Sequence, residues 1–206
     1  MSDATSLAEL DGILAFLRAA ERLKVTHRSA YTSEGQAESV AEHSWRLSLM
    51  ALVLRDHFPE VQFAKLLSMC VIHDLGEAIR GDVPAPEQAR RRAGDPAASK
   101  SAAEREDLLT LVAPLPYNVR VEITALWDEY EAGLSPTARV AKALDKLETI
   151  LQHTQGDNPP DFDYRFNLGY GRAFTVDHPL IVRLREVLDR ETSRLADARD
   201  GARGSL

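Results

Sequence analysis

Residues 69–82 of this chain concentrate side chains that could bind a cation or transfer a proton. The segment holds His73, Asp74, Glu77 and Asp82 within ten consecutive positions. On a helix, His73 and Glu77 would lie one turn apart on the same face, and the adjacent His73 and Asp74 would diverge by about 100°. One cation lying between His73 and Asp74 could therefore bind both.

The apolar residues before this group support a chemical role. Leu66, Leu67, Met69, Cys70, Val71 and Ile72 precede the His-Asp pair. Ionisable groups beside such a run are costly to bury unless they are paired or bound to a metal. The alternative is a structural cluster of paired side chains, because a His-Asp dipeptide also occurs by chance.

The composition describes one ordinary globular domain. The chain has 206 residues, of which 44% are hydrophobic and 28% are charged, and nothing in it demands a second core. A net charge of −7 argues against binding to a nucleic-acid polymer, which needs a basic surface. The single Cys70, the lack of an apolar run of membrane-spanning length and the lack of a secretion signal predict a cytoplasmic protein without membrane contact.

Apolar periodicity predicts an all-α fold. We expect helices at residues 6–24, 38–57, 61–80, 102–112, 116–131, 135–151 and 179–195. The connections are expected to be a polar loop at 25–37, a mobile surface segment at 88–101, a long irregular loop at 155–175 and a frayed end at 196–206. No strand-like alternation extends beyond a few residues.

Two further ligand-type residues lie beside apolar helix faces. His43 is on the helix predicted at 38–57, and a histidine on a largely apolar helix is more often a hydrogen-bonded core residue than a ligand. Asp145 lies on the helix that begins at Ser135-Pro136, where Lys142 or Lys146 could be its ion-pair partner.

Taken in order, His43, the pair His73-Asp74 and Asp145 resemble the signature of the HD-domain metal-dependent phosphohydrolases, over about residues 38–155. The segments 38–44, 73–77, 81–84 and 142–145 resemble more closely the small HD proteins that act as 5′-deoxynucleotidases, over about residues 10–195. This resemblance implies a compact single-domain helical bundle in residues 1–206. Helices 6–24 and 179–195 would pack on its core, and the protein would be a homodimer.

The resemblance assigns His43, His73, Asp74 and Asp145 as ligands of a divalent cation. Two imidazoles and two carboxylates suit Mn²⁺, Co²⁺, Fe²⁺, Ni²⁺ or Zn²⁺, and Mg²⁺ less well because it prefers oxygen ligands. Glu77 would transfer a proton during catalysis. Asp82 would contact the substrate or hold a second cation with Glu77.

The resemblance also places the substrate. Arg28 matches the arginine that binds the 5′-phosphate, and its fork of donors suits bidentate phosphate recognition. Tyr31 is expected to replace a tryptophan often found near that arginine. Asp82, Val83 and Pro84 are expected to complete the substrate site.

The implied activity is metal-dependent hydrolysis of (deoxy)nucleoside 5′-monophosphates to the nucleoside and phosphate. One alternative is another HD phosphohydrolase, acting on a cyclic nucleotide, a nucleoside triphosphate or a guanosine alarmone. The other is a binding module that holds a nucleotide without turning it over.

Overall fold

The computed structural model of the chain describes residues 6–83 and 97–203. The α-helices in these residues are α1 (Leu7–Ala20), α2 (Val40–Leu54), α3 (Phe63–Ile72), α4 (Glu77–Arg80), α6 (Ala97–Val112), α7 (Tyr117–Ala132), α8 (Pro136–Gln155), α9 (Tyr164–Gly169) and α10 (Pro179–Arg203). Short 3₁₀ helices are η1 (Glu21–Lys24), η2 (Arg55–His57) and η3 (Arg172–Phe174). The predicted all-α class is confirmed. Pro84 and most of the predicted surface segment 88–101 lie outside the described residues.

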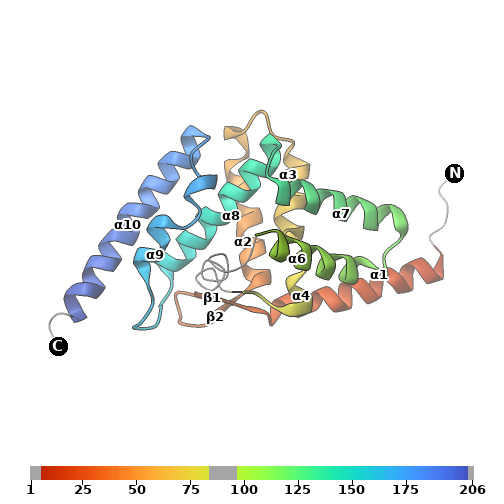
Figure 1. Cartoon of the computed structure of the whole chain (residues 1–206), viewed down its shortest axis with the longest axis horizontal. Coiled ribbons are helices and arrows are strands. Elements are labelled where there is room, and N and C mark those ends of the chain that lie inside the picture. Colours follow the sequence, from red (N-terminus) through yellow and green to blue (C-terminus); the bar gives the residue numbers. More distant parts are fainter. Residues whose placement is uncertain (1–5, 84–96, 204–206) are drawn as a thin grey trace.

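Helix α8 runs through the middle of the molecule (Figure 1). It packs against α2, α3, α7 and α10, and 14 of its 20 residues are buried. Leu144, Leu147 and Ile150 of α8 join Leu47 of α2 and Met69 of α3 in one apolar cluster. Because α8 is covered along most of its length, polar side chains on it are also buried and need partners within the protein.

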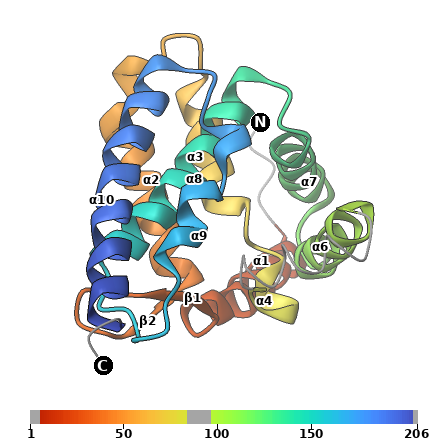
Figure 2. The same ribbon diagram turned by 60° about the vertical axis from the view of Figure 1, so that its left-hand side comes forward.

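A second apolar cluster lies where α4, α6 and α7 approach η1, on the side of the molecule seen at the lower right of Figure 2. It contains Leu75, Leu108 and Trp127. Helix α1 contacts η1 and α6, whereas α10 contacts α8 and α9. Within the described residues, no helix is both long enough and apolar enough to span a membrane.

The predicted loop at 25–37 contains a β-hairpin, so that part of the prediction is wrong. Strands β1 (His27–Tyr31) and β2 (Ala37–Ser39) pair antiparallel, and Gly35 takes the positive φ of 76° in the turn. Ser39 then caps α2 through a capping box with Glu42. The cap explains why α2 begins at Val40 rather than at residue 38.

The continuous helix expected through residues 73–77 is interrupted. Helix α3 ends at Ile72, and the next hydrogen bonds span three residues, as in Glu77 N–H to the Asp74 carbonyl at 3.0 Å. A side chain at Gly76 would lie 3.0 Å from the carbonyl oxygen of Glu104, so glycine is what lets α6 approach this turn. The predicted i,i+4 relation of His73 and Glu77 on one regular helix is therefore wrong.

The C-terminal part is more regular than expected. Helix α9 and η3 lie inside the predicted loop 155–175, and α10 continues to Arg203. Arg165 of α9 pairs with Asp197 and Asp200 of α10 at 2.9 and 2.6 Å, and Ala196 is buried. These contacts explain why residues 196–203 are not frayed. Helix α6 likewise begins at Ala97, five residues earlier than predicted.

Candidate active site

Four ligand-type atoms from three helical regions converge beside α8. His43 Nε2 of α2 lies 3.4 Å from Asp145 Oδ1 of α8 and 3.9 Å from Asp74 Oδ2. His73 Nε2, at the end of α3, lies 3.0 Å from the same Asp74 oxygen. Sequence positions 43, 73, 74 and 145 are thus brought to one point, as the resemblance implied.

These spacings suit a common metal ion. Two ligand atoms that are each about 2.1 Å from an ion lie about 3.0 Å apart at a 90° angle and about 3.4 Å apart at a tetrahedral angle. The separations of 3.0 and 3.4 Å match these two values, and the separation of 3.9 Å between His43 Nε2 and Asp74 Oδ2 corresponds to a wider angle at the ion. His43, His73 and Asp145 are all buried, so the shared point is screened from bulk water.

The orientation of the two imidazoles also fits a metal. His73 Nδ1 donates to the carbonyl oxygen of Cys70 at 3.0 Å, and His43 Nδ1 hydrogen-bonds to Glu148. The Nε2 atoms of both rings are buried and make no hydrogen bond within the described residues. The Nε2 atoms therefore face the two aspartates, while the Nδ1 atoms are held by hydrogen bonds. Ligating histidines usually have this arrangement, with one ring nitrogen free for the metal and the other hydrogen-bonded.

The site stabilises positive charge. Burial and Arg28 lower the pKa of His43, but the carboxylates of Glu148 and Asp145 outweigh them and raise it to about 9. Burial likewise opposes ionisation of Asp145, yet Lys146 and the two histidines hold its pKa well below the usual range. A divalent cation can supply the positive charge that the His43 proton supplies in its absence.

Asp145 is fixed by two donors on its second oxygen. Tyr130 Oη donates to Oδ2 at 2.9 Å, and Lys146 Nζ lies 2.7 Å from the same atom. Lys142 instead pairs with Glu131 Oε2 at 3.0 Å. Of the two ion-pair partners considered from the sequence, only Lys146 reaches Asp145, and it leaves Oδ1 directed at His43.

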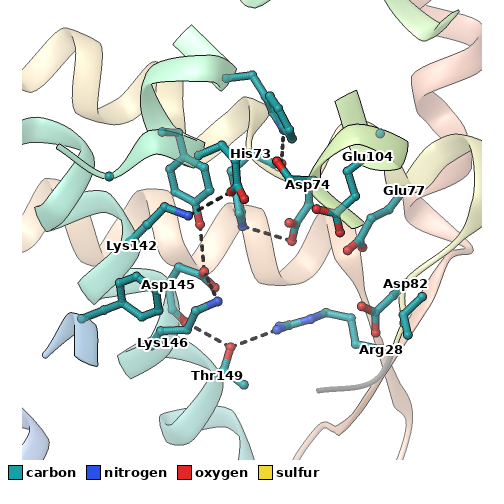
Figure 3. A pocket seen from close by; sticks show the side chains of 18 of the residues that line it. Arg28, His73, Asp74, Glu77, Asp82, Glu104, Lys142, Asp145, Lys146 and Thr149 are labelled. Atoms are coloured by element: carbon teal, nitrogen blue, oxygen red, sulfur yellow. Dashed lines mark hydrogen bonds and ion pairs between the residues drawn. The ribbon is translucent and has the colours of Figure 1, made fainter. Parts of the chain in front are cut away.

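A cavity of about 320 Å³ opens beside this cluster, which is within the usual size range of small-molecule sites. Figure 3 shows acidic and basic side chains entering it from different sides. Its lining includes Arg28, His73, Asp74, Glu77, Asp82, Val83, Glu104, Asp145, Lys146, Thr149 and Tyr170. The predicted residues Arg28, Glu77, Asp82 and Val83 thus share one cavity with the histidine and aspartate cluster.

Glu77 lies on the acidic side of the cavity with Asp82 and Glu104 (Figure 3). Burial and the carboxylates of Asp74 and Asp82 raise the pKa of Glu77 to about 10. Its Oε2 is buried and makes no hydrogen bond within the described residues. Glu77 can therefore hold a proton next to the cluster without belonging to the four converging atoms.

Arg28 enters from β1 and is anchored at both ends of its fork. Nη1 lies 3.0 Å from Glu38 Oε2, and Nη2 donates to Thr149 Oγ1 at 2.9 Å. Tyr31 is not part of the cavity lining. The part of β1 that lines the cavity is Arg28, Ser29 and Ala30, and it ends before Tyr31. The expectation that Tyr31 contacts the substrate is not supported by this geometry.

Several residues that support the site were not predicted from the sequence. Glu38, Tyr130, Glu148 and Thr149 hold the predicted residues in place. Glu148 and Thr149 could have been found, because they are three and four positions after Asp145 and therefore lie on the same face of its helix. Cys70, the single cysteine, is buried, and burial raises the pKa of its thiol to about 12.

A helical fold that brings two histidines and two aspartates to one point beside a cavity is the architecture of an HD-domain metalloprotein. A family model described as an HD domain matches residues 20–182. The chain belongs to the HD-domain family, which implies a divalent metal ion at a histidine and aspartate cluster.

Particular relatives narrow the comparison. The chain is 32% identical to the 5′-deoxynucleotidase HDDC2 of Mus musculus over 188 residues, covering 90% of this chain and 89% of that protein. It is 30% identical to the human protein of the same name over 184 residues, covering 88% and 86% of the two chains. A crystal structure from Magnetospirillum magnetotacticum, described as a predicted metal-dependent phosphohydrolase, is similar with a TM-score of 0.76. It has 27% identity and covers 93% of this chain and 97% of that one.

Proposed function

We propose that this protein is a metal-dependent 5′-deoxynucleotidase that hydrolyses deoxynucleoside 5′-monophosphates to the deoxynucleoside and phosphate. The observation that carries the proposal is the convergence of His43, His73, Asp74 and Asp145 on the wall of a cavity that Arg28 also lines. Relatives that match about nine-tenths of the chain and are named 5′-deoxynucleotidases support the choice of substrate.

In this proposal His43, His73, Asp74 and Asp145 hold a divalent transition-metal ion. Mn²⁺, Co²⁺, Fe²⁺, Ni²⁺ and Zn²⁺ suit the two imidazole ligands better than Mg²⁺ does. When bound, such an ion lowers the pKa of a coordinated water and offsets negative charge on the phosphate. Glu77 and Asp82 are the proposed ligands of a second cation.

The remaining roles belong to the side chains of the chain itself. Arg28 binds the 5′-phosphate, and its contacts with Glu38 and Thr149 orient its guanidinium before the substrate arrives. Lys146 adds a second positive charge on the opposite side of the cavity (Figure 3). The positive charges of Arg28 and Lys146 favour binding of a doubly charged phosphate monoester over binding of a neutral nucleoside.

Proton transfer is assigned to the Glu77 carboxyl. Its position next to Asp74, and outside the four converging atoms, allows it to exchange a proton with the attacking water or with the leaving 5′ oxygen. Asp82 and Val83 line the cavity beyond Glu77 and are proposed to contact the nucleoside. Pro84 is proposed to act with them.

We further propose that residues 1–206 form one domain, with its core at about 38–155, and that the protein is a cytoplasmic homodimer. The buried free Cys70 is compatible with a reducing compartment. Helix α2 carries exposed apolar side chains at Trp45, Leu49, Leu52 and Val53, a spacing that puts them on one helix face. Light scattering on the protein as it elutes from a size-exclusion column measures the molar mass of the assembly. A monomer mass at micromolar concentration would contradict the proposed dimer.

The central experiment is metal-by-substrate profiling of the purified protein. Metal-free protein is supplied with each divalent ion and assayed against deoxynucleoside and ribonucleoside 5′-monophosphates, 3′-monophosphates, triphosphates and cyclic nucleotides, with phosphate, pyrophosphate and nucleoside measured separately. We expect phosphate release from deoxynucleoside 5′-monophosphates with a transition metal. Release of pyrophosphate from triphosphates, or nucleotide binding with no product in any metal, would overturn the proposed activity.

A further inference from the structure

Glu148 is a fully buried carboxylate one turn after Asp145 on α8. Its Oε2 accepts the hydrogen bond from His43 Nδ1, and its Oε1 accepts one from Arg46 Nε at 2.7 Å. A carboxylate with no exposure is expensive to keep ionised unless charged donors surround it. The position of Glu148 therefore calls for an explanation beyond packing.

The same carboxylate lies beside the proposed phosphate contact. Arg28 Nη1 is 3.7 Å from Glu148 Oε2 and 3.0 Å from Glu38 Oε2. Arg46 Nη2 is 3.9 Å from Glu38 Oε1. Two carboxylates and two guanidiniums thus alternate in a closed network, and His43 is attached to it through Glu148.

A second metal ion is a poor explanation of this network. Ligand atoms of Glu38, His43 and Glu148 lie within 4.8 Å of one another, which is close enough for a common ion. However, His43 Nδ1 is already hydrogen-bonded to Glu148, and Arg28 and Arg46 supply the positive charge beside the two carboxylates. An added cation would face two guanidiniums at close range.

The two histidines of the site are anchored in different ways. His73 Nδ1 is held by the main-chain carbonyl of Cys70, which no substitution removes, whereas His43 Nδ1 is held by a side chain. Outer partners of this kind fix the tautomer and the ring orientation of a ligating histidine. His43 is therefore the ligand whose orientation depends on one replaceable residue.

We propose that Glu148 is a positioning residue that aligns His43 toward the metal and Arg28 toward the substrate phosphate through one buried carboxylate. This inference rests on the proposed function, because it assumes that His43 binds a metal and that Arg28 binds the phosphate. It predicts that loss of Glu148 weakens two kinds of binding together, although Glu148 touches neither ligand. Glu38, which contacts Arg28 but makes no hydrogen bond to His43, should affect only one of them.

The test compares Glu148→Gln with two controls. His43 and Arg46 donate to different oxygens of Glu148, and the amide replaces one of these oxygens by an NH₂ group, which is a donor and cannot accept either bond. We expect the Kd for Co²⁺, titrated calorimetrically into the metal-free protein, to rise about 10- to 100-fold, and the KM for the nucleotide to rise as well. Glu38→Gln should raise KM and leave the Kd for Co²⁺ unchanged. Asp189→Asn, which removes an acceptor of Arg185 on α10, should change neither quantity.

A Glu148→Gln protein that melts at the wild-type temperature and binds Co²⁺ with wild-type affinity would overturn the inference. Glu148→Asp keeps the charge and should recover part of the affinity, which a loss of packing alone would not produce. If Glu148→Gln does not fold, the wild-type protein loaded with Zn²⁺ decides the matter by nitrogen-15 spectroscopy of its imidazoles. A His43 proton on Nε2 rather than on Nδ1 would then exclude the role.

The proposed function and this inference can fail separately. If the His43→Ala variant binds Co²⁺ as tightly as the wild type does, the proposed metal site itself is refuted. Metal binding that depends on both His43 and Glu148, without hydrolysis of any deoxynucleotide, would refute the activity and leave the positioning role intact.

Discussion

Replacing Glu77 by glutamine isolates the proton-transfer step from binding. Glu77 does not belong to the group of ligand atoms that His43, His73 and Asp145 bring together. Arg28 is held by Glu38 and Thr149 and not by Glu77. The Gln side chain has nearly the same shape, so the nucleotide and the ion held by His43, His73, Asp74 and Asp145 should still bind. Loss of a positioned proton-transfer group generally reduces kcat by about 10²- to 10⁴-fold, which is about 2.7 to 5.4 kcal/mol in the barrier.

The stability of Glu77→Gln gives an independent check. Burial and the nearby carboxylates raise the pKa of Glu77 to about 10 in the metal-free protein. At neutral pH the group is therefore protonated there, and an amide is a close replacement for a neutral carboxyl. We expect the metal-free variant to unfold at the wild-type temperature, so that a loss of rate cannot be attributed to misfolding.

The assay measures kcat, KM and bound metal on the same preparation. Glu131→Gln is the matched control, because Glu131 also lines the cavity but pairs with Lys142 away from the acidic side; its kcat should stay near the wild-type value. Wild-type kcat in Glu77→Gln would show that Glu77 transfers no proton. A reduced metal content in this variant would instead identify Glu77 as a ligand, as the proposed second cation requires.

Three further perturbations test the other side chains of the cavity. Arg28→Lys cannot contact Glu38 and Thr149 together, so KM should rise about 10- to 100-fold, as expected for loss of a charged hydrogen bond; unchanged kinetics would contradict the phosphate assignment. Lys146→Met should weaken both metal and substrate binding, whereas Lys65→Met, outside the cavity, should change neither. Burial lowers the pKa of His153 to about 4. Because the folded state binds this proton less readily than the unfolded state does, the free energy of unfolding decreases by about 3 kcal/mol as the pH falls from about 6.5 to 4. His153→Asn should flatten that part of the curve of unfolding free energy against pH, and an unchanged slope would disprove the shift.

The fold class was predictable because apolar periodicity is a local property. The seven predicted helices correspond to α1, α2, α3, α6, α7, α8 and α10, with shifts at their ends. The largest errors have two causes. The strands of the hairpin at 27–39 are only five and three residues long, too short for a strand pattern to stand out. The extension of α10 to Arg203 depends on contacts with α9, which no local pattern reveals.

The converging residues were predictable from their types and order, whereas their supports were not. His73 and Asp74 stand out beside an apolar run, and His43 and Asp145 lie beside apolar helix faces. Tyr130 and Glu38 give no such signal, because a tyrosine and a glutamate are ordinary residues on a helix surface and at a strand end. Only the packing of α7 against α8 brings Tyr130 to Asp145, and only the pairing of β2 with β1 brings Glu38 to Arg28.

Helix α8 explains why the site and the core cannot be separated in this protein. Leu144 and Leu147 fill the apolar cluster from the same turns that carry Asp145 and Glu148 into the site. A rotation of the helix would expose the leucines and move both acids at once, so the burial of apolar area that stabilises the fold also fixes the angle of the acids. Precise placement of the ligands therefore follows from ordinary core packing, and the site requires from α8 only that two of its buried positions be acidic and be matched by Lys146, His43 and Arg46.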